Sequence, residues 1–364
     1  MALTGDVLAT FRRQSDGCRM LGSPFTAMLC DVLADYLDDT TAFGRRIQAW
    51  PGDSGHDALA LRAAGGLHAL ARSGQAAELI PFPPPSTGPA ELWSRLAPAV
   101  ARHDAFLHAY LDSPPQTNEV ARSGAILGGL FTIATATRLP LDLLEIGSSA
   151  GLNLGADGYR YDFGGRHWGN EDSKVLVRCA WDGDTPRHDT PLQVAERAGC
   201  DRNPLNPLSP ADRERLLSYI WADQTERLKR TELALEAAAR APWRVEQADA
   251  ADWVEARLAT PRQPGTTLVL MHTIVWQYLP GPGKGRIEAA LRDAGERAGS
   301  DTPLAWFRME YDGNTEAAGL YLTLWPGFDD HSLGRADYHG RWVHWEASSP
   351  SRWRWREQHS SAGV

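Results

Sequence analysis

The sequence predicts an α/β protein: a doubly wound, mostly parallel sheet that ends in an antiparallel hairpin, preceded by a helical region. After residue 139, strand-like apolar runs alternate with helical patterns, which is typical of repeated strand–helix–strand units. Before residue 138, apolar residues recur at helical spacing instead. The last two strand-like runs, 320–325 and 341–346, are about fifteen residues apart. That distance is short for a helical crossover, so antiparallel pairing of the two runs is expected.

Residues 1–138 are predicted to form a helical cap region. Ser23 stands directly before Pro24, which is typical of a helix start, and apolar residues then recur at helical spacing as far as Leu37. Further helices are expected at 58–70, 91–112 and 119–137. We expect these helices to cover the domain that follows, with an independent helical domain as the alternative.

Residues 139–364 are predicted to form the α/β domain, with a β-rich insertion at about 157–190. The main strands are expected at 141–146, 243–249, 266–272, 303–310, 320–325 and 341–346. One long amphipathic helix is expected at 210–240, and another helix at 284–299. Each parallel strand would end at the same edge of the sheet, which is where open α/β sheets bind their ligands.

Composition narrows the class of protein. Hydrophobic residues make up 43% and charged residues 23% of the 364 residues, which are globular values. A net charge of −9 without a long basic block argues against nucleic-acid binding. The four cysteines are scattered, the start does not resemble a signal peptide, and no apolar run approaches 18 residues. We therefore expect a cytoplasmic, reduced protein with no membrane span and no nucleic-acid partner.

A small-residue turn is the most informative feature of the chain. The apolar run 141–146 leads into Glu145-x-Gly147-x-Ser149-x-Gly151, which predicts a buried strand, a tight turn and then a helix start. Small side chains let a ligand approach the backbone closely, and free N–H groups at a helix start favour electron-rich ligand groups. The pattern predicts a nucleotide-type cofactor at this edge of the sheet. A strand–turn–helix without a ligand is the alternative.

The turn resembles the glycine motif of class I S-adenosylmethionine-dependent methyltransferases, which have a Rossmann-like sheet ending in an antiparallel hairpin. Ser149 stands where that motif usually has a glycine. The resemblance implies S-adenosylmethionine as cofactor, contacted by Glu145, Gly147, Ser149, Gly151 and Asn153. It also implies that an acid holds the ribose hydroxyls. This acid is Asp201, although it comes fifty residues after the turn, and Asp182 is its rival. By the same resemblance, Asp249 and Ala250 contact the adenine.

Over nearly its whole length, the chain resembles an uncharacterised bacterial family, a domain of unknown function. The resemblance spans roughly residues 7–347 and implies no established activity. The motifs that carry it are Phe11-Arg-x-Gln14, Gly22-Ser-Pro24, Glu145-Ile-Gly-x-Ser-Ala-Gly-Leu-Asn153, Gly199-Cys-Asp201, Trp221-x-Asp-Gln224 and Pro303-Leu-Ala-Trp306.

Polar residues at two predicted strand ends are the catalytic candidates. His272 ends the run 266–272 and Glu310 ends the run 303–310. His272 is the proposed general base, because histidine titrates near working pH. The substrate-binding candidates are aromatic or charged residues: Trp276, Tyr278, Arg308, Asp223 and Arg227. The alternatives are a structural histidine, a buried ion pair between Arg308 and Glu310, and a solvated, ion-paired helix face.

The resemblance to methyltransferases implies methyl transfer from S-adenosylmethionine to a small molecule. Two other classes of function stay open. Gly147-x-Ser149-x-Gly151 also fits the nucleophile turn of a serine hydrolase. An acid and a histidine would then come from Glu310 or Asp329 and from His339 or His344. The second class is a non-catalytic protein that binds a nucleotide-type ligand. No ligand pair shows familiar zinc spacing, so no metal is expected.

Overall fold

The structure is a computed structural model that describes residues 3–85, 87–184, 191–262, 264–327 and 329–346. The chain divides into two compact units. The helical unit comprises Met1–Thr117 and Leu208–Glu232, and the sheet unit comprises Asn118–Pro207 and Leu233–Val364. The predicted boundary at 138/139 falls just before the first strand of the main sheet, whereas the units part at 117/118.

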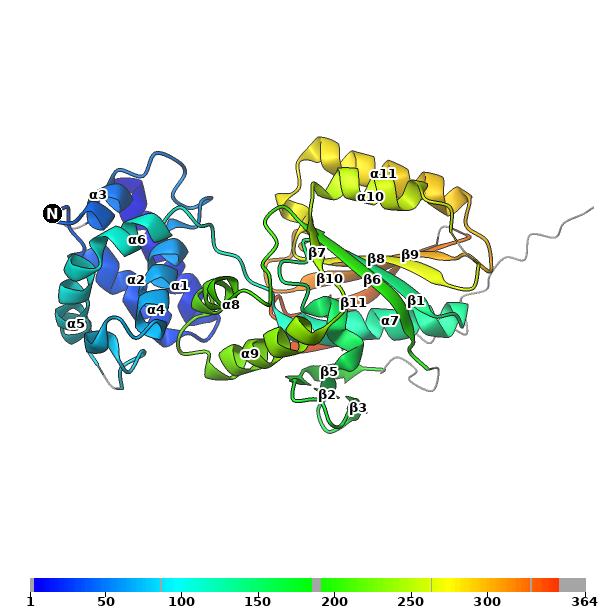
Figure 1. Ribbon diagram of the computed structural model, residues 1–364, viewed down its shortest axis with the longest axis horizontal. Coiled ribbons are helices and arrows are strands. Elements are labelled where there is room, and N and C mark those ends of the chain that lie inside the picture. The colour runs from blue at the N-terminus through cyan, green and yellow to red at the C-terminus, as the bar shows by residue number, and fades with distance from the viewer. Residues whose placement is uncertain (1–2, 86, 185–190, 263, 328, 347–364) are drawn as a thin grey trace, which may run out of the picture. The chain divides into compact units, whose positions relative to one another are not determined.

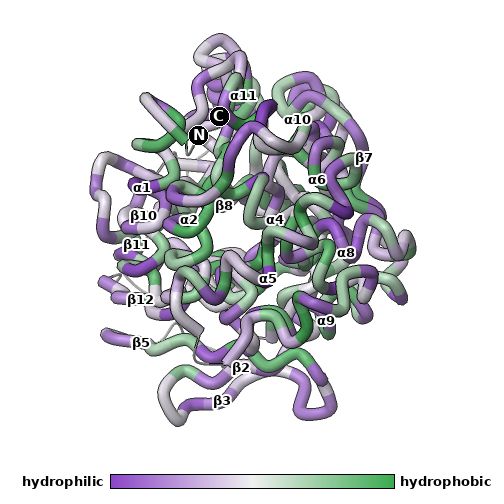
Figure 2. The backbone as a smooth tube through the Cα atoms, turned by 90° about the vertical axis from the view of Figure 1, so that its left-hand side faces the viewer, coloured by the Kyte–Doolittle hydropathy of each residue, from purple (hydrophilic) through white to green (hydrophobic). Residues whose placement is uncertain are grey.

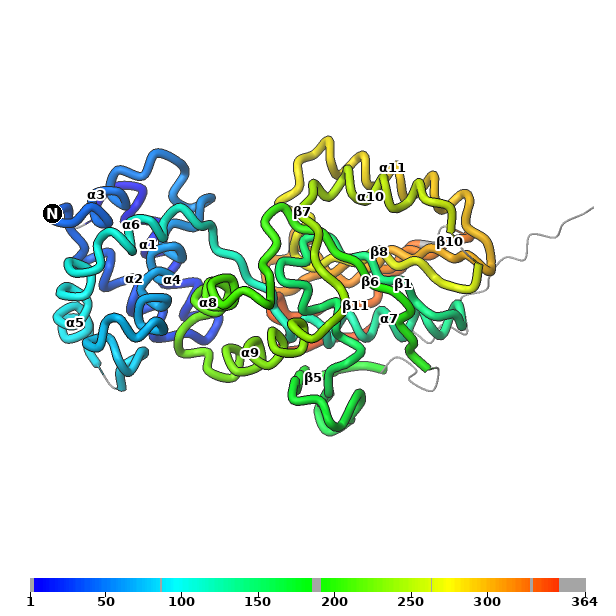
Figure 3. The backbone as a smooth tube through the Cα atoms, viewed as in Figure 1, coloured from blue at the N-terminus to red at the C-terminus, as the bar shows by residue number. Residues whose placement is uncertain are grey.

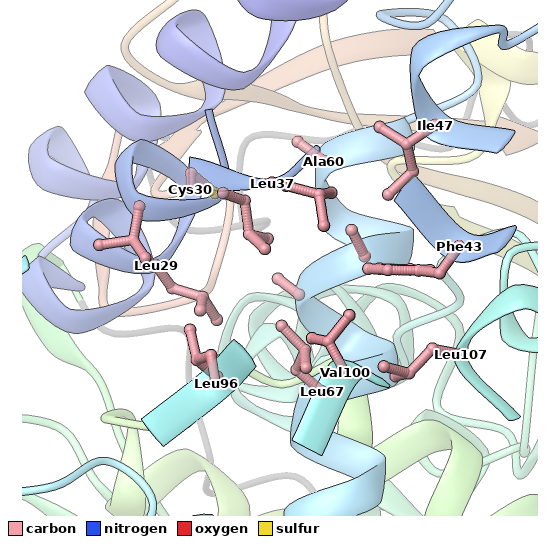
Figure 4. Close-up of a cluster of buried hydrophobic side chains, with 14 of the residues drawn as sticks. Leu29, Cys30, Leu37, Phe43, Ile47, Ala60, Leu67, Leu96, Val100 and Leu107 are labelled. Carbon is pink, nitrogen blue, oxygen red and sulfur yellow. The ribbon is translucent and has the colours of Figure 1, made fainter. Parts of the chain in front are cut away.

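The helical unit is built around one apolar core. Its helices are α1 Gly5–Met20, α2 Pro24–Tyr36, α3 Ala42–Gln48, α4 Leu59–Arg72, α5 Pro89–Arg102, α6 Asp104–Tyr110 and α8 Pro210–Ser218, with the short η1 Ala77–Leu79 and the first part of α9 Thr225–Arg240. Side chains from α2 to α6 meet in the core, and Figure 4 shows Leu29, Phe43, Leu67 and Val100 among them. The predicted helices at 24–37 and 58–70 are confirmed as α2 and α4.

The single helix predicted at 210–240 is wrong, because the structure has α8 and α9 with a break between them. The break places Asp223 beside the start of α2, where its carboxylate accepts hydrogen bonds from Phe25 N at 2.9 Å and from the Ser23 hydroxyl. The carboxylate thus satisfies N–H and O–H donors at a helix start, where no intrahelical partner exists. The helix predicted at 91–112 also divides, into α5 and α6, at His103.

The main sheet of the second unit is mostly parallel, as predicted. Its described strands run in the order β5-β12-β11-β10-β9-β8-β1-β6-β7. Five consecutive strands of this order are parallel to one another: β7 Val245–Gln247, β6 Val194–Asp201, β1 Leu141–Ile146, β8 Thr267–Thr273 and β9 Leu304–Glu310. Their carboxyl ends therefore meet at one edge. Figure 2 colours much of β8 as hydrophobic, in keeping with a strand whose faces are both covered.

Helices cover both faces of the sheet (Figure 1). On one face lie α10 Ala250–Ala259 and α11 Gly281–Glu296, whose Val254 and Ile287 share a buried cluster with Leu270. On the other face lies α7 Ser123–Thr137. Glycines let α7 approach closely, because a Cβ atom at Gly129 would lie 2.4 Å from the Phe307 ring of β9. The apolar helix predicted at 119–137 is thus a helix of the sheet unit.

The predicted pairing of the last two strands is wrong. β10 Ala318–Trp325 and β12 Trp342–Trp345 do not pair with each other, because β11 Asp329–Ala336 lies between them and is antiparallel to both. The segment between the two predicted strands is therefore itself a strand. Its polar sequence, Asp-Asp-His-Ser, does not predict a strand. The segment becomes a strand through its hydrogen bonds to the two neighbouring strands.

A β-rich segment lies between β1 and β6 in the chain. β6 follows the β-rich segment, which contains β2 Arg160–Asp162, β3 His167–Gly169, β4 Leu176–Arg178 and β5 Ala180–Gly183. The first three of these form a small separate sheet in the order β3-β2-β4, and β5 joins the edge of the main sheet. Figure 3 shows the chain passing from α7 into β1, which is the middle one of the five parallel strands.

One helical stretch among the described residues, Val120–Thr137, is long and apolar enough to cross a membrane by length and composition alone. Within the fold, 78% of this stretch is buried. The core helix of a water-soluble protein meets the same criterion, and α7 packs against β9 in this way.

Candidate functional site

The turn after β1 adopts a conformation that small residues favour. Gly147, Ser149 and Gly151 have φ values of +67°, +54° and +72°, in the left-handed region that other residues rarely adopt. Ser149 therefore takes a glycine-like conformation at the position where the methyltransferase motif usually has glycine. A Cβ atom at Gly147 would lie 2.5 Å from the Val275 side chain, so the turn packs tightly against the segment that follows β8.

Two acids flank this turn. Asp201, at the end of β6, accepts a hydrogen bond from Ser149 N at 2.9 Å with one oxygen and from Asn203 N with the other. Glu145, at the end of β1, is 2% exposed, and its Oε2 atom is buried without a hydrogen-bond partner. Burial, together with the charge of Asp201, raises the pKa of Glu145 to about 8. A hydrogen bond from Ser148 and the charge of Arg122 act in the opposite direction.

Two buried asparagines lie just beyond the turn. Asn153 is 1% exposed, and its Oδ1 atom is buried without a partner. Asn118 accepts a hydrogen bond from Leu152 N at 2.9 Å. The sequence had given no role to Asn118. In the sequence, Asn118 stands directly before an apolar helix. That position does not indicate its contact with Leu152, which lies 34 residues further along the chain.

The two rival acids for the ribose lie far apart in the sheet. Asp201 contacts the turn directly. Asp182 lies on β5 and pairs with His344 Nδ1 at 2.7 Å. Six strand spacings separate β5 from β1, which at about 4.8 Å each amounts to roughly 29 Å. Asp182 is therefore remote from the turn that Asp201 contacts.

Asp249 and Ala250 lie after β7, the neighbour of β6. Asp249 Oδ1 accepts hydrogen bonds from Ala251 N at 2.9 Å and Asp252 N at 3.3 Å, which makes it the N-cap of α10. Its other oxygen is not used by this cap. The predicted adenine contact is thus compatible with the cap and remains a prediction.

The two catalytic candidates contact each other. His272 Nδ1 lies 2.6 Å from Glu310 Oε1, and the Trp306 indole N–H donates to His272 Nε2 over 3.0 Å. Because an indole can only donate, Nε2 is the acceptor and Nδ1 carries the hydrogen that Glu310 receives. His272 is fully buried and uses both ring nitrogens. Glu310 is the member of the pair with an unused atom, since its Oε2 is buried without a partner.

Val275 connects this pair to the turn. Its backbone N–H donates to Glu310 Oε1 at 3.1 Å, and its side chain occupies the space that a Cβ atom at Gly147 would need. The glycine turn and Glu310 thus contact the same residue. The structure therefore brings together two features that the sequence placed 163 positions apart.

Aromatic side chains pack around His272. Trp276 stacks on His272 with ring centroids 5.1 Å apart, and Trp276 and Trp306 lie 5.6 Å apart. The Arg308 guanidinium lies 4.1 Å from the centre of the Trp306 ring and pairs with Asp330. Arg308 therefore does not form the ion pair with Glu310 that the sequence left open. Tyr278, by contrast, is 72% exposed.

Asp223 and Arg227 belong to the helical unit. Asp223 holds the start of α2, and Arg227 donates to Gln224 Oε1 at 2.9 Å. They are not placed on one continuous helix, because α9 begins at Thr225. Their predicted contact with substrate remains a prediction.

Two hollows of the described structure lie away from the turn and from Glu310. Among the residues described, no group of three or more His, Cys, Asp or Glu side chains is arranged to hold a metal ion. A cavity of about 20 Å³ in the helical unit, beside His68, has room for about one water. An open surface hollow of about 500 Å³ lies beside Trp325 and Gly295. Neither is lined by the turn or by Glu310.

The fold and the site define an α/β protein with a glycine-like turn at the carboxyl edge of a mostly parallel sheet and a buried histidine–glutamate pair beside it. The chain belongs to a family described as uncharacterised proteins conserved in bacteria (DUF2332), which matches residues 8–345. No curated protein and no solved structure matches the chain.

Proposed function

We propose that the protein transfers a methyl group from S-adenosylmethionine to a small molecule. The observation that carries this proposal is a set of buried polar atoms without partners around the turn: Glu145 Oε2, Ser149 Oγ and Asn153 Oδ1. A buried polar atom that makes no hydrogen bond costs about 1–3 kcal/mol. A ligand that brings hydrogen-bond donors would remove this cost. The ammonium group and ribose hydroxyls of S-adenosylmethionine are such donors.

The charges at the turn favour this cofactor over a dinucleotide. A pyrophosphate needs free N–H groups, but the N–H of Ser149 already donates to Asp201. The carboxylate of Asp201 also flanks the turn, and it would repel a pyrophosphate. A ligand with a positive charge and hydroxyl groups matches these surroundings better.

The strand order supports the same class. Parallel strands in the order β7-β6-β1-β8-β9 correspond by chain position to 3-2-1-4-5, the order of doubly wound nucleotide-binding sheets. The turn follows the first of these strands and Asp201 ends the second. The sheet departs from the methyltransferase pattern beyond β9, where β10, β11 and β12 are added one after another in antiparallel pairs.

The protein's own residues would position and desolvate the reactants. The cofactor supplies an electrophilic methyl group when it is bound. Asp201 would hold the ribose hydroxyls, Glu145 would accept a hydrogen bond from the ammonium group, and the backbone of the turn would lie against the ligand. Glu310 would accept a proton, and His272 would hold Glu310 in place through the hydrogen bond at 2.6 Å.

A serine hydrolase is the less favoured alternative. Ser149 has the positive φ of a strained turn, but its Oγ atom has no hydrogen-bond partner, whereas a triad needs a histidine there. His272 uses both ring nitrogens elsewhere. His344 lies on β12, five strand spacings from β1, which is roughly 24 Å.

Isothermal calorimetry of the full chain with S-adenosylhomocysteine tests the proposal. We expect binding, and Asp201→Asn should weaken it about 10- to 100-fold, since a charged hydrogen bond contributes about 1.5–3 kcal/mol. Asp182→Asn is the matched control and should leave the affinity within twofold. Absence of binding at millimolar ligand, or binding of NAD in its place, would refute the proposal.

A further inference from the structure

Glu310 carries a buried carboxylate oxygen that no described protein group uses. The residue is 6% exposed. Its Oε1 atom receives hydrogen bonds from His272 and Val275, while Oε2 has no partner. An unpaired oxygen in such a place is costly unless a ligand donates to it. The natural complement is a group that carries both a positive charge and an N–H donor.

Aromatic rings lie beside His272, the hydrogen-bond partner of the other oxygen of Glu310. His272, hydrogen-bonded to Glu310, stacks on Trp276 with nearly parallel rings, 13° apart. Trp306 lies against both rings, and its indole N–H is directed to His272. The faces of tryptophan rings attract cations, and flat apolar groups pack well against them. Arg308 already uses Trp306 in this way, at 4.1 Å.

We infer that the methyl acceptor is an amine carried on a flat apolar group, and that Glu310 both binds its ammonium form and removes its proton. This inference rests on the proposed methyl transfer. The shared contact with Val275 places Glu310 beside the turn where the methyl donor is proposed to bind.

The acid–base chemistry favours an amine over the other common acceptors. A carboxylate substrate would be repelled by Glu310. An aliphatic hydroxyl group is a far weaker acid than an ammonium group, so a carboxylate removes its proton much less readily. A thiol or phenol carries no positive charge for the carboxylate to pair with. An amine arrives as a cation and needs to lose one proton before it can attack.

The transfer balances with these groups alone. The N–H bond of the ammonium breaks and its proton goes to Glu310 Oε2. The freed lone pair on nitrogen forms the bond to the methyl carbon, and the electrons of the breaking carbon–sulfur bond stay on sulfur. The products are S-adenosylhomocysteine and the methylated ammonium, and Glu310 then returns its proton to solvent.

Binding of three matched probes tests the inference without relying on turnover. Phenethylamine, 2-phenylethanol and 3-phenylpropionate share a flat ring and differ in the charge of the end group. Calorimetry with and without S-adenosylhomocysteine should show binding of the amine at least tenfold tighter than that of the other two. Glu310→Gln should remove this preference. Glu316→Gln, a change of the same charge at an exposed acid, should retain it.

Transfer of a labelled methyl group completes the test. Label should reach the amine, and Glu310→Gln should reduce the rate at least 100-fold while S-adenosylhomocysteine affinity stays within threefold, which also shows that the variant is folded. Glu310→Asp retains the charge and should keep the preference for the amine. Cofactor binding without any preference for the amine, or label on the alcohol or acid instead, would overturn the inference and leave the proposed function standing. Absence of cofactor binding would refute the proposed function itself.

Discussion

The buried carboxyl group of Glu145 makes the stability of the protein depend on pH. Burial raises its pKa from 4.5 to about 8. Between these values the native state keeps a proton that the unfolded chain has lost, so the free energy of unfolding falls as pH rises from about 4.5 to about 8. Each pKa unit corresponds to about 1.4 kcal/mol. A shift of about 3.5 units therefore gives an upper value of about 5 kcal/mol.

Glu145→Gln isolates this effect, because glutamine has the same shape and does not titrate. Urea unfolding of both proteins should be measured at pH 5, 6, 7 and 8. The free energy of unfolding of the wild type, minus that of the variant, should fall by several kcal/mol from pH 5 to pH 8. Other buried groups cancel in this difference. One is His68, whose pKa burial lowers to about 4, which makes stability rise with pH between about 4 and 6.5 in both proteins.

Parallel pH profiles for the two proteins would refute the reasoning, since Glu145 would then not be held neutral in the native state. Bound S-adenosylmethionine should reduce the difference, because its ammonium group favours the ionised carboxylate. Calorimetry at pH 7 in buffers of different ionisation enthalpy should then show release of up to one proton on binding. An unchanged proton count in Glu145→Gln would contradict the assignment of that proton to Glu145.

Three further predictions concern neighbouring residues. Ser149→Ala should keep S-adenosylhomocysteine affinity within a few-fold, measured by calorimetry; a serine-reactive phosphonate that labels Ser149 would instead favour the hydrolase. His272→Asn breaks the hydrogen bond to Glu310 and should lower kcat about 10- to 100-fold, with a smaller change in KM for the amine. If His272→Asn lowered kcat by the same factor in a Glu310→Gln background, the two residues would not act together. Asp223→Asn weakens the cap of α2 and should lower the free energy of unfolding by about 1 kcal/mol. The affinity for the cofactor should not change, and a loss of that affinity would place Asp223 in the site.

The sequence predicted the turn and four of the five parallel strands, β1, β7, β8 and β9, because their signals are local. It did not predict β6, and the helix start expected after the turn is the short 3-10 helix η3 Asn153–Gly158. The run that forms β8 is mostly apolar, and the small residues of the turn follow an apolar run that is typical of a buried strand. Positive φ at Gly147 and Gly151 is the conformation for which glycine is the usual residue. The sequence also indicated His272 and Glu310, because each ends a strand.

The antiparallel edge and the contacts within the site depended on the tertiary structure. β11 is polar and becomes a strand only because β10 and β12 bind it on both sides, and the break before α9 places Asp223 at the start of a helix 200 positions earlier. That Asp201 contacts the turn and Asp182 lies remote from it depends on the strand order. The contact of Val275 with both the turn and Glu310 likewise comes from the packing of three strands. By itself the sequence determines which residues are apolar, small or charged along each segment. Which polar groups meet is decided by the pairing of distant segments. That pairing depends on the burial and hydrogen bonding of the whole chain.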